Sequence, residues 1–169
     1  MSHATVVAEG SRPAVRLERL LPDPPETVWE AITDRGQLQQ WFPSDVEVDG
    51  GEWTPGAAIT FRFPADVIDM TLRGEVLVVD RPRALAFTWG EETLRFALEP
   101  EGSGTRRVLT DELPAAHAAR NAVGWDECLD RLCRLETKSA AWQVRFDRYR
   151  EAFEPVLGPQ EGPPAGYKG

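Results

Sequence analysis

The chain has 169 residues, a length that fits one domain, or one domain with tails, and excludes two large domains. With 41% hydrophobic and 28% charged residues, its composition is that of a globular protein and argues against wholesale disorder. The formal net charge of -9 argues against nucleic acid or an anionic membrane as a partner, because phosphate binding needs a basic face. Neither an apolar run of about 18 residues nor a signal-peptide pattern in residues 1–13 is present, so we expect a cytoplasmic protein.

A strand followed by two short helices is predicted at the start of the domain. Residues 14–21 alternate well enough to form a strand with one buried face. Asp23 with Glu26 forms a capping-box pattern that predicts a helix directly after it, and Asp34 with Gln37 predicts a second one. The apolar positions of the two helices are Val28, Trp29, Ile32, Leu38, Trp41 and Phe42.

From residue 45 to residue 113 the hydrophobic period is two and turn residues recur, which predicts six further antiparallel strands. In the last of them Arg107 and Leu109 fall on the same face, so the inward face of that strand stays undecided. Met70, Leu72, Gly74, Val76 and Val78 are predicted to share one face of a single strand. The polar residues predicted on the solvent face are Asp69, Arg73, Glu75 and Arg95.

After residue 114 the period returns to 3.6, with a first apolar stripe that must lie on the sheet: Trp125, Cys128, Leu129, Leu132 and Cys133. A second stripe follows: Trp142, Phe146, Tyr149 and Phe153. One long bent helix and two helices both fit this pattern. The second stripe needs a partner, either a neighbouring subunit or the first strands, and we interpret it as a homodimer surface. Residues 14–157 are then one domain, with a mobile leader (1–13) and a disordered tail (158–169).

Few residues suited to catalysis or metal binding are present. Cys128 and Cys133 lie five residues apart in a predicted helix and point in different directions, so we expect buried structural thiols and no disulfide between them. The only histidines are His3 and His117, which gives no zinc-like spacing. The sequence also lacks a nucleophile elbow and a phosphate-binding glycine loop. We therefore predict no catalytic residue, no metal and no cofactor.

Several residue clusters, in their order and spacing, carry a family resemblance over about residues 14–135. They are Pro25 with Val28-Trp29, Trp41-Phe42, Gly50-Gly51, Gly74-Glu75-Val76, Pro82 with Leu85 to Trp89, Gly104-Thr105, and Gly124-Trp125 with Leu129 and Leu132. In this pattern the chain resembles the START-like (SRPBCC) superfamily, and within it the family homologous to the C-terminal domain of the activator of heat shock protein 90 ATPase. The resemblance implies an α+β helix-grip fold. In such a fold a curved antiparallel sheet, here of about seven strands, wraps around a long C-terminal helix.

This resemblance also implies a cavity between the sheet and the helix, suited to a small hydrophobic ligand. The residues predicted to line it are Trp41, Phe42, Phe61, Phe63, Met70, Leu72, Trp89, Phe96, Trp125, Leu129 and Leu132. The alternative is that the same side chains interdigitate as a solid core. Binding without catalysis is the function that we predict.

Two other functions stay open. A cyclase or aromatase would need an acid or base aimed into the cavity. The candidates are His117, which we expect at the surface, and Arg19, which shares parity with buried residues and would need Glu30 or Asp126 as a partner. A partner-binding module, including a chaperone activator, is the third reading. The chain has no room for the separate chaperone-binding domain of the eukaryotic activator, which argues against that role.

Overall fold

The structure, a computed structural model, describes residues 4–8, 12–132 and 142–164. Two short 3-10 helices, η1 (Asp49–Gly51) and η2 (Ala115–His117), accompany the longer elements. The longer elements are β1 (Thr5–Val7), β2 (Ala14–Leu21), α1 (Pro25–Thr33), α2 (Arg35–Trp41), β3 (Asp45–Val48), β4 (Ala58–Arg62), β5 (Thr71–Asp80), β6 (Ala84–Trp89), β7 (Glu92–Glu101), β8 (Gly104–Glu112), α3 (Ala118–Leu132) and α4 (Trp142–Leu157).

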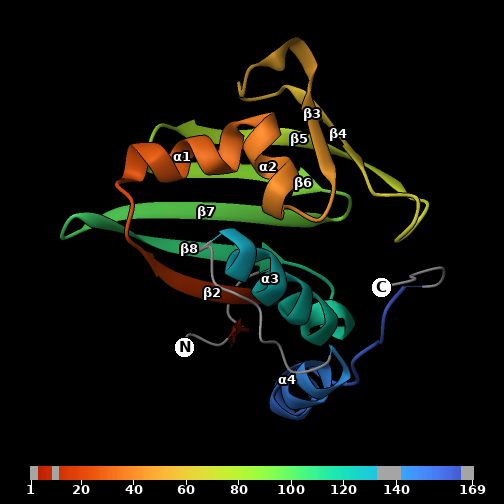
Figure 1. The fold of residues 1–169 in the computed structure, drawn as a ribbon. Coiled ribbons are helices and arrows are strands. Elements are labelled where there is room, and N and C mark those ends of the chain that lie inside the picture. Colours follow the sequence, from red (N-terminus) through yellow and green to blue (C-terminus); the bar gives the residue numbers. More distant parts are fainter. Residues whose placement is uncertain (1–3, 9–11, 133–141, 165–169) are drawn as a thin grey trace.

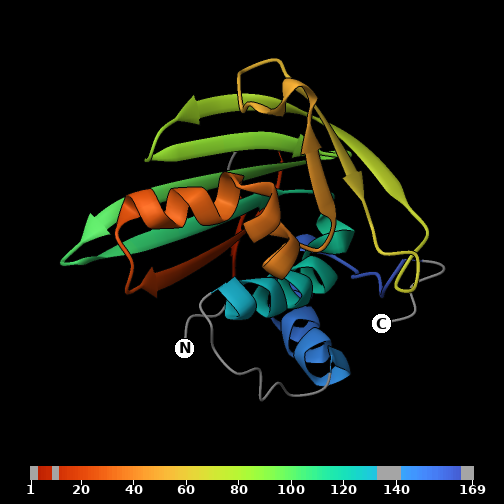
Figure 2. The ribbon, with the colours of Figure 1, turned by 45° about the horizontal axis from the view of Figure 1, so that its top comes forward.

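The strands of the described residues form one antiparallel sheet of eight, in the order β1-β2-β8-β7-β6-β5-β4-β3. From β3 to β8 each strand pairs with the next along the chain, whereas β2 pairs with β8. The crossing from β2 to β3 is made by α1 and α2, which lie across one face of the sheet, with α3 beside them and α4 beyond α3 (Figure 1). The turned view shows the sheet bending around these helices (Figure 2). The predicted α+β helix-grip fold is confirmed.

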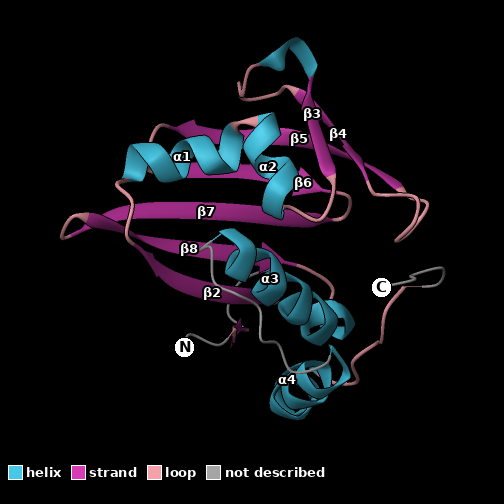
Figure 3. Cartoon of the chain, in the orientation of Figure 1, coloured by secondary structure: helices cyan, strands magenta, loops and turns pink. Residues whose placement is uncertain are grey.

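The helices α1, α2 and α3 lie on the inner face of the bent sheet (Figure 3), which favours burial of every second side chain of the strands they cover. Leu94, Phe96 and Leu98 of β7 are buried, and Arg95 between them is exposed, as the alternation predicts. In β5 the pairing register shifts between Val76 and Val78. Val76 is 1% exposed and Val78 is 40% exposed, so the prediction that the two share one face was wrong.

One of the two predicted helix caps is present in the structure and the other is not. At α2, the side chain of Asp34 accepts the backbone N–H of Gln37 at 2.9 Å, which confirms the predicted cap. At α1, the N-cap is Pro24 and no side chain caps the helix, so the capping box predicted at Asp23 was wrong. Pro25 in the first turn leaves fewer free N–H groups to satisfy there, because proline has none.

Segments on both sides of the predicted domain are ordered parts of the fold. β1 pairs with β2, with Val6 opposite Val15, and adds a strand inside the predicted leader. At the other end, the side chain of Gln160 accepts the backbone N–H of Ala119 at 2.8 Å. The backbone N–H of Glu161 donates to the carbonyl of Ala116 at 2.7 Å. Residues 158–164 thus lie against the start of α3, where free N–H groups need acceptors.

Two helices, α3 and α4, take the place of the one long helix that the pattern also allowed. Phe146, Tyr149 and Phe153 of α4 are buried within this chain, while Trp142 is half-buried and stacks on Phe146 with 5.0 Å between ring centroids. This burial removes the exposed stripe on which the predicted homodimer rests. Cys133 lies outside the described residues. No helix within the described ranges is both long and apolar enough to span a membrane.

A buried polar network joins β2, α3, α4 and the segment before β1. The guanidinium of Arg19 lies 3.0 Å from Asp126 Oδ1 and 3.5 Å from Asp130 Oδ1, so of the two partners considered for Arg19, Glu30 and Asp126, the structure pairs it with Asp126. The hydroxyl of Tyr149 donates to Asp126 Oδ2 and accepts the backbone N–H of Ala4 at 3.2 Å. This network holds α4 on α3, and with it the end of the domain.

Replacing the tyrosine tests the network. We expect Tyr149→Phe to lower the free energy of unfolding by about 1–3 kcal/mol, because it removes a buried hydrogen bond to a carboxylate. The measurement is urea denaturation. Val144→Ala, at a position 53% exposed on the same helix, is the matched control and should change stability by less than about 0.5 kcal/mol. Equal stability of Tyr149→Phe and the wild type would contradict the assigned role.

Candidate functional site

A cavity of about 590 Å³ lies between α3, the end of α2, the β4–β5 connection and the β6–β7 turn. Aromatic rings form part of its wall, with Trp89 5.9 Å from Phe63 and 5.4 Å from Trp125 between centroids. Six of the predicted residues line this cavity: Phe42, Phe63, Met70, Leu72, Trp89 and Trp125. The volume falls in the range of small-molecule sites, roughly 300–1,000 Å³.

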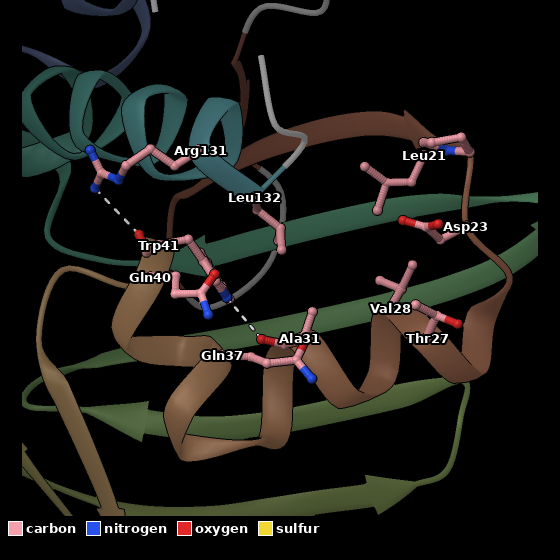
Figure 4. A pocket seen from close by; sticks show the side chains of 11 residues that line it. Leu21, Asp23, Thr27, Val28, Ala31, Gln37, Gln40, Trp41, Arg131 and Leu132 are labelled. Atoms are coloured by element: carbon pink, nitrogen blue, oxygen red, sulfur yellow. Dashed lines mark hydrogen bonds between the residues drawn. The ribbon is translucent and has the colours of Figure 1, made fainter. Parts of the chain in front are cut away.

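The other predicted lining residues lie elsewhere. Trp41 and Leu132 line a second, smaller pocket of about 120 Å³, which shares Gln40 and Arg131 with the large cavity. Figure 4 shows this pocket between α1, α2 and the end of α3, where Arg131 donates to the carbonyl of Trp41. The side chain of Trp41 is 2% exposed, and its indole N–H donates to Ala31 at 2.8 Å, so it acts as a structural residue.

Phe61, Phe96 and Leu129 belong to the packed core and not to the cavity wall, which corrects that part of the prediction. The rings of Trp41 and Phe42, at the end of α2, pack on the two phenylalanines of this group, Phe61 and Phe96. Phe42 stacks on Phe61 with centroids 6.1 Å apart, and Trp41 meets Phe96 edge to face at 6.2 Å. The inner face therefore has solid packing under α2 and an open cavity beside it. The predicted cavity and the alternative of a solid core each describe one part of this face.

A polar cluster at the cavity combines residues from two strands and one helix. Glu92 begins β7 and Asp111 lies near the end of β8, as diagonal neighbours on the inner face. Asn121 and Trp125 project from α3 four residues apart, on one side of the helix. The amide of Asn121 donates to Glu92 Oε1 at 2.6 Å and to Asp111 Oδ2 at 3.2 Å, and the indole N–H of Trp125 donates to Asp111 Oδ2 at 2.9 Å.

Burial determines the protonation of this cluster. It raises the pKa of Glu92 to about 10, with the charge of Asp111 adding to the effect and that of Arg120 opposing it. Burial also raises the pKa of Asp111, to about 6, while hydrogen bonds from Glu92, Trp125 and Asn121 lower it. At neutral pH the two carboxyl groups therefore share one proton, which Glu92 carries and donates toward Asp111.

Further ionisable groups line the same cavity. Burial raises the pKa of Glu127, and raises that of the Cys128 thiol to about 12, so this cysteine is a structural thiol and a poor nucleophile. His117, expected at the surface, lines the cavity, and its Nε2 lies 3.0 Å from a carboxylate oxygen of Glu161. Arg120 donates to the carbonyl of Gly162 at 3.0 Å. The lining thus combines an apolar wall with a partly acidic end.

The sequence analysis missed Glu92, Asp111 and Asn121. Glu92 has the same parity in its strand as Leu94, so the alternation of that strand was a signal that could have placed it on the inner face. Asp111 shares the face of Leu109 and of Arg107, which is 0% exposed, and the parity of that strand was undecided. Only the packing of α3 shows that Asn121 faces the two carboxyl groups.

Comparison with known proteins identifies solved structures of the same fold and a family to which the chain belongs. Solved structures share the helix-grip fold: EF2215 from Enterococcus faecalis, of unknown function, is 22% identical over 90% of this chain and 91% of its own, with a TM-score of 0.74. CalU16 from Micromonospora echinospora is 21% identical over 93% and 96%, with a TM-score of 0.65. DynU16, from the dynemicin biosynthetic locus, is 26% identical over 72% and 46%, with a TM-score of 0.61.

The profile of the family described as Activator of Hsp90 ATPase homolog 1-like protein matches residues 23–135. The chain belongs to this family, within the START-like superfamily, which confirms the resemblance. No curated protein matches the chain. Because many functions share this kind of fold, family membership defines the architecture and leaves the activity to be argued from the site.

The raised pKa of Glu92 predicts a pH-dependent stability. Below a pH of about 4.5 both the folded and the unfolded chain bind this proton, whereas between about 4.5 and about 10 only the folded chain keeps it. Wild-type stability therefore falls as the pH rises through that window. Glu92→Gln carries no titrating group, so its stability relative to the wild type should increase with pH, by up to about 1.4 kcal/mol per pH unit.

Urea denaturation of both proteins at about pH 5 and about pH 8 makes the comparison. Glu75→Gln is the control, because that carboxyl lies on the exposed outer face of β5. The control should track the wild type at both values. A stability difference between Glu92→Gln and the wild type that stays constant with pH would refute the protonated state assigned to Glu92.

Proposed function

We propose that the protein binds a small lipophilic molecule in the cavity between the sheet and α3. The observation that carries the proposal is the cavity itself, about 590 Å³ beside a core that is otherwise tightly packed. The cavity leaves apolar side chains facing water, and a ligand that covers them would remove that apolar surface from water. The indole N–H of Trp89 on the wall has no acceptor among the described residues, and an acceptor atom on a ligand would satisfy it.

A second candidate is an enzyme that performs acid-base chemistry in the same cavity. The observation in its favour is Glu92, a lining carboxyl group that holds a proton at neutral pH. Arg19, a candidate from the sequence, pairs with Asp126 in the network between β2, α3 and α4 and does not line the cavity. If the protein is an enzyme, Glu92 is therefore the better candidate for its acid. A partner-binding role and a cytoplasmic location stay predictions.

Filling the cavity from within tests ligand binding. Gly124 of α3 lines the cavity, and a Cβ added there would meet no atom within 4 Å. We expect Gly124→Leu to fold, since leucine favours helices more than glycine does, and to weaken binding at least tenfold because its side chain occupies the cavity. The measurement is a fluorescence titration with N-phenyl-1-naphthylamine, a neutral dye that becomes bright in apolar surroundings.

Ala152→Leu, on the exposed side of α4, is the matched control and should bind the dye as the wild type does. Native mass spectra of the freshly purified protein provide a second measurement, in which a retained lipophile appears as extra mass that denaturation removes. Equal dye binding by Gly124→Leu and the wild type would show that the dye occupies another site. A wild type that binds no dye and retains no ligand would contradict the proposed function.

A further inference from the structure

The acidic end of the cavity contains carboxyl groups that no cation neutralises directly. Among the described residues, no ion pair within 4.0 Å includes Glu92, Asp111 or Glu127. The charged groups that act on the pair from a distance are Arg120 on Glu92 and Arg12 on Asp111. The pair therefore keeps one negative charge at the side of a largely apolar cavity.

The two arginines that line the cavity are engaged elsewhere. Arg120 donates to the carbonyl of Gly162 and lies 3.7 Å from a carboxylate oxygen of Glu161. Arg131 donates to the carbonyl of Trp41 and to the sulfur of Cys128, each at 3.3 Å. Among the described residues that line the cavity, each arginine already has a hydrogen-bond partner, whereas the charge of the carboxyl pair has no ion-pair partner and would repel an anionic ligand.

The chemistry of the cavity separates three kinds of ligand. A carboxylate would be repelled, and a purely apolar ligand would strip water from Glu92 without replacing its interactions. An ammonium group would neutralise the single charge that Glu92 and Asp111 share, and would donate a short hydrogen bond to the lining carboxyl group. No proton needs to be transferred, because one positive charge meets one negative charge.

We infer that the ligand of this cavity is a lipophilic amine, whose apolar body lies against Phe63, Trp89 and Trp125 and whose ammonium group binds at Glu92, the member of the Glu92–Asp111 pair that lines the cavity. The inference rests on the proposed function, since it assigns the ligand class of the same cavity. It goes beyond a hydrophobic fit because it places a charged group at a defined pair of side chains.

Competition against the neutral dye tests the inference. Decylamine, 1-decanol and decanoate share one chain length and differ in the head group, and each would be titrated into protein loaded with N-phenyl-1-naphthylamine. We expect decylamine to displace half of the dye at a concentration at least tenfold lower than decanol, and decanoate to displace it least.

The variant Glu92→Gln with Asp111→Asn removes both carboxyl groups with little change of shape. It should still bind the dye, and its preference for decylamine over decanol should fall to less than threefold. The matched control removes two exposed carboxyl groups, Glu75→Gln with Glu99→Gln, and should keep the preference. The control separates the local charge of the cavity from the net charge of -9 of the whole chain.

Each outcome has one meaning. Equal displacement by decylamine and decanol, or a preference that survives in the cavity double variant, overturns the inference while dye binding leaves the proposed function standing. A wild type that binds neither dye nor amine overturns both. Melting temperatures of the two double variants show whether lost displacement reflects lost folding, and dye binding by the cavity variant gives the same check at the site.

Discussion

The inner face of the bent sheet is longer than its helices can cover, and the rest of the structure depends on how they share it. α1 lies against β7 and β8 and α2 lies against β3, with Trp29, Trp41 and Phe42 all buried. α3 lies against β2, fixed there by the Arg19–Asp126 pair. The end of α2 and α3 meet at Phe42 and Trp125, whose ring centroids lie 5.6 Å apart, and the cavity lies beside this contact. Its position follows from helix lengths, since α2 ends at Trp41 and the chain turns away at Pro43.

Buried acids at the cavity are the clearest sign that this region serves more than folding. Placing Glu92 and Asp111 side by side away from water costs stability, because one of them must hold a proton far above its ordinary pKa. An apolar pair at these positions would pack without that cost. Asn121 and Trp125 donate hydrogen bonds that orient the pair, so neighbouring side chains hold both carboxyl groups in place.

Membership of the family described as Activator of Hsp90 ATPase homolog 1-like protein fits the architecture and says less about the activity. A further feature of this chain is the segment that follows α4. Residues 158–164 lie against the start of α3, and Pro163 and Pro164 line the cavity. The carboxylate of Glu161 lies 3.0 Å from Nε2 of His117 and 3.7 Å from the guanidinium of Arg120, so it engages two side chains that line the cavity. The C-terminal segment therefore contributes to the electrostatics of the site.

The sequence by itself determined the six strands after β2, the cap at Asp34 and the inward aromatic residues Phe63 and Trp89, because these depend on local periodicity and capping. Its resemblance to a known family implied the fold class. The sequence also offered Glu30 and Asp126 as partners for Arg19, since a buried cation requires a carboxylate. Only the tertiary structure decided which inward residues fill the core and which line the cavity, because that depends on where α2 stops. It alone brought Glu92, Asp111 and Asn121 together, since their contact requires the register of β7 on β8 and the rotation of α3. It also placed the second aromatic stripe inside the chain, where α3 and the segment before β1 cover it, a contact between residues more than 100 positions apart that no local pattern encodes.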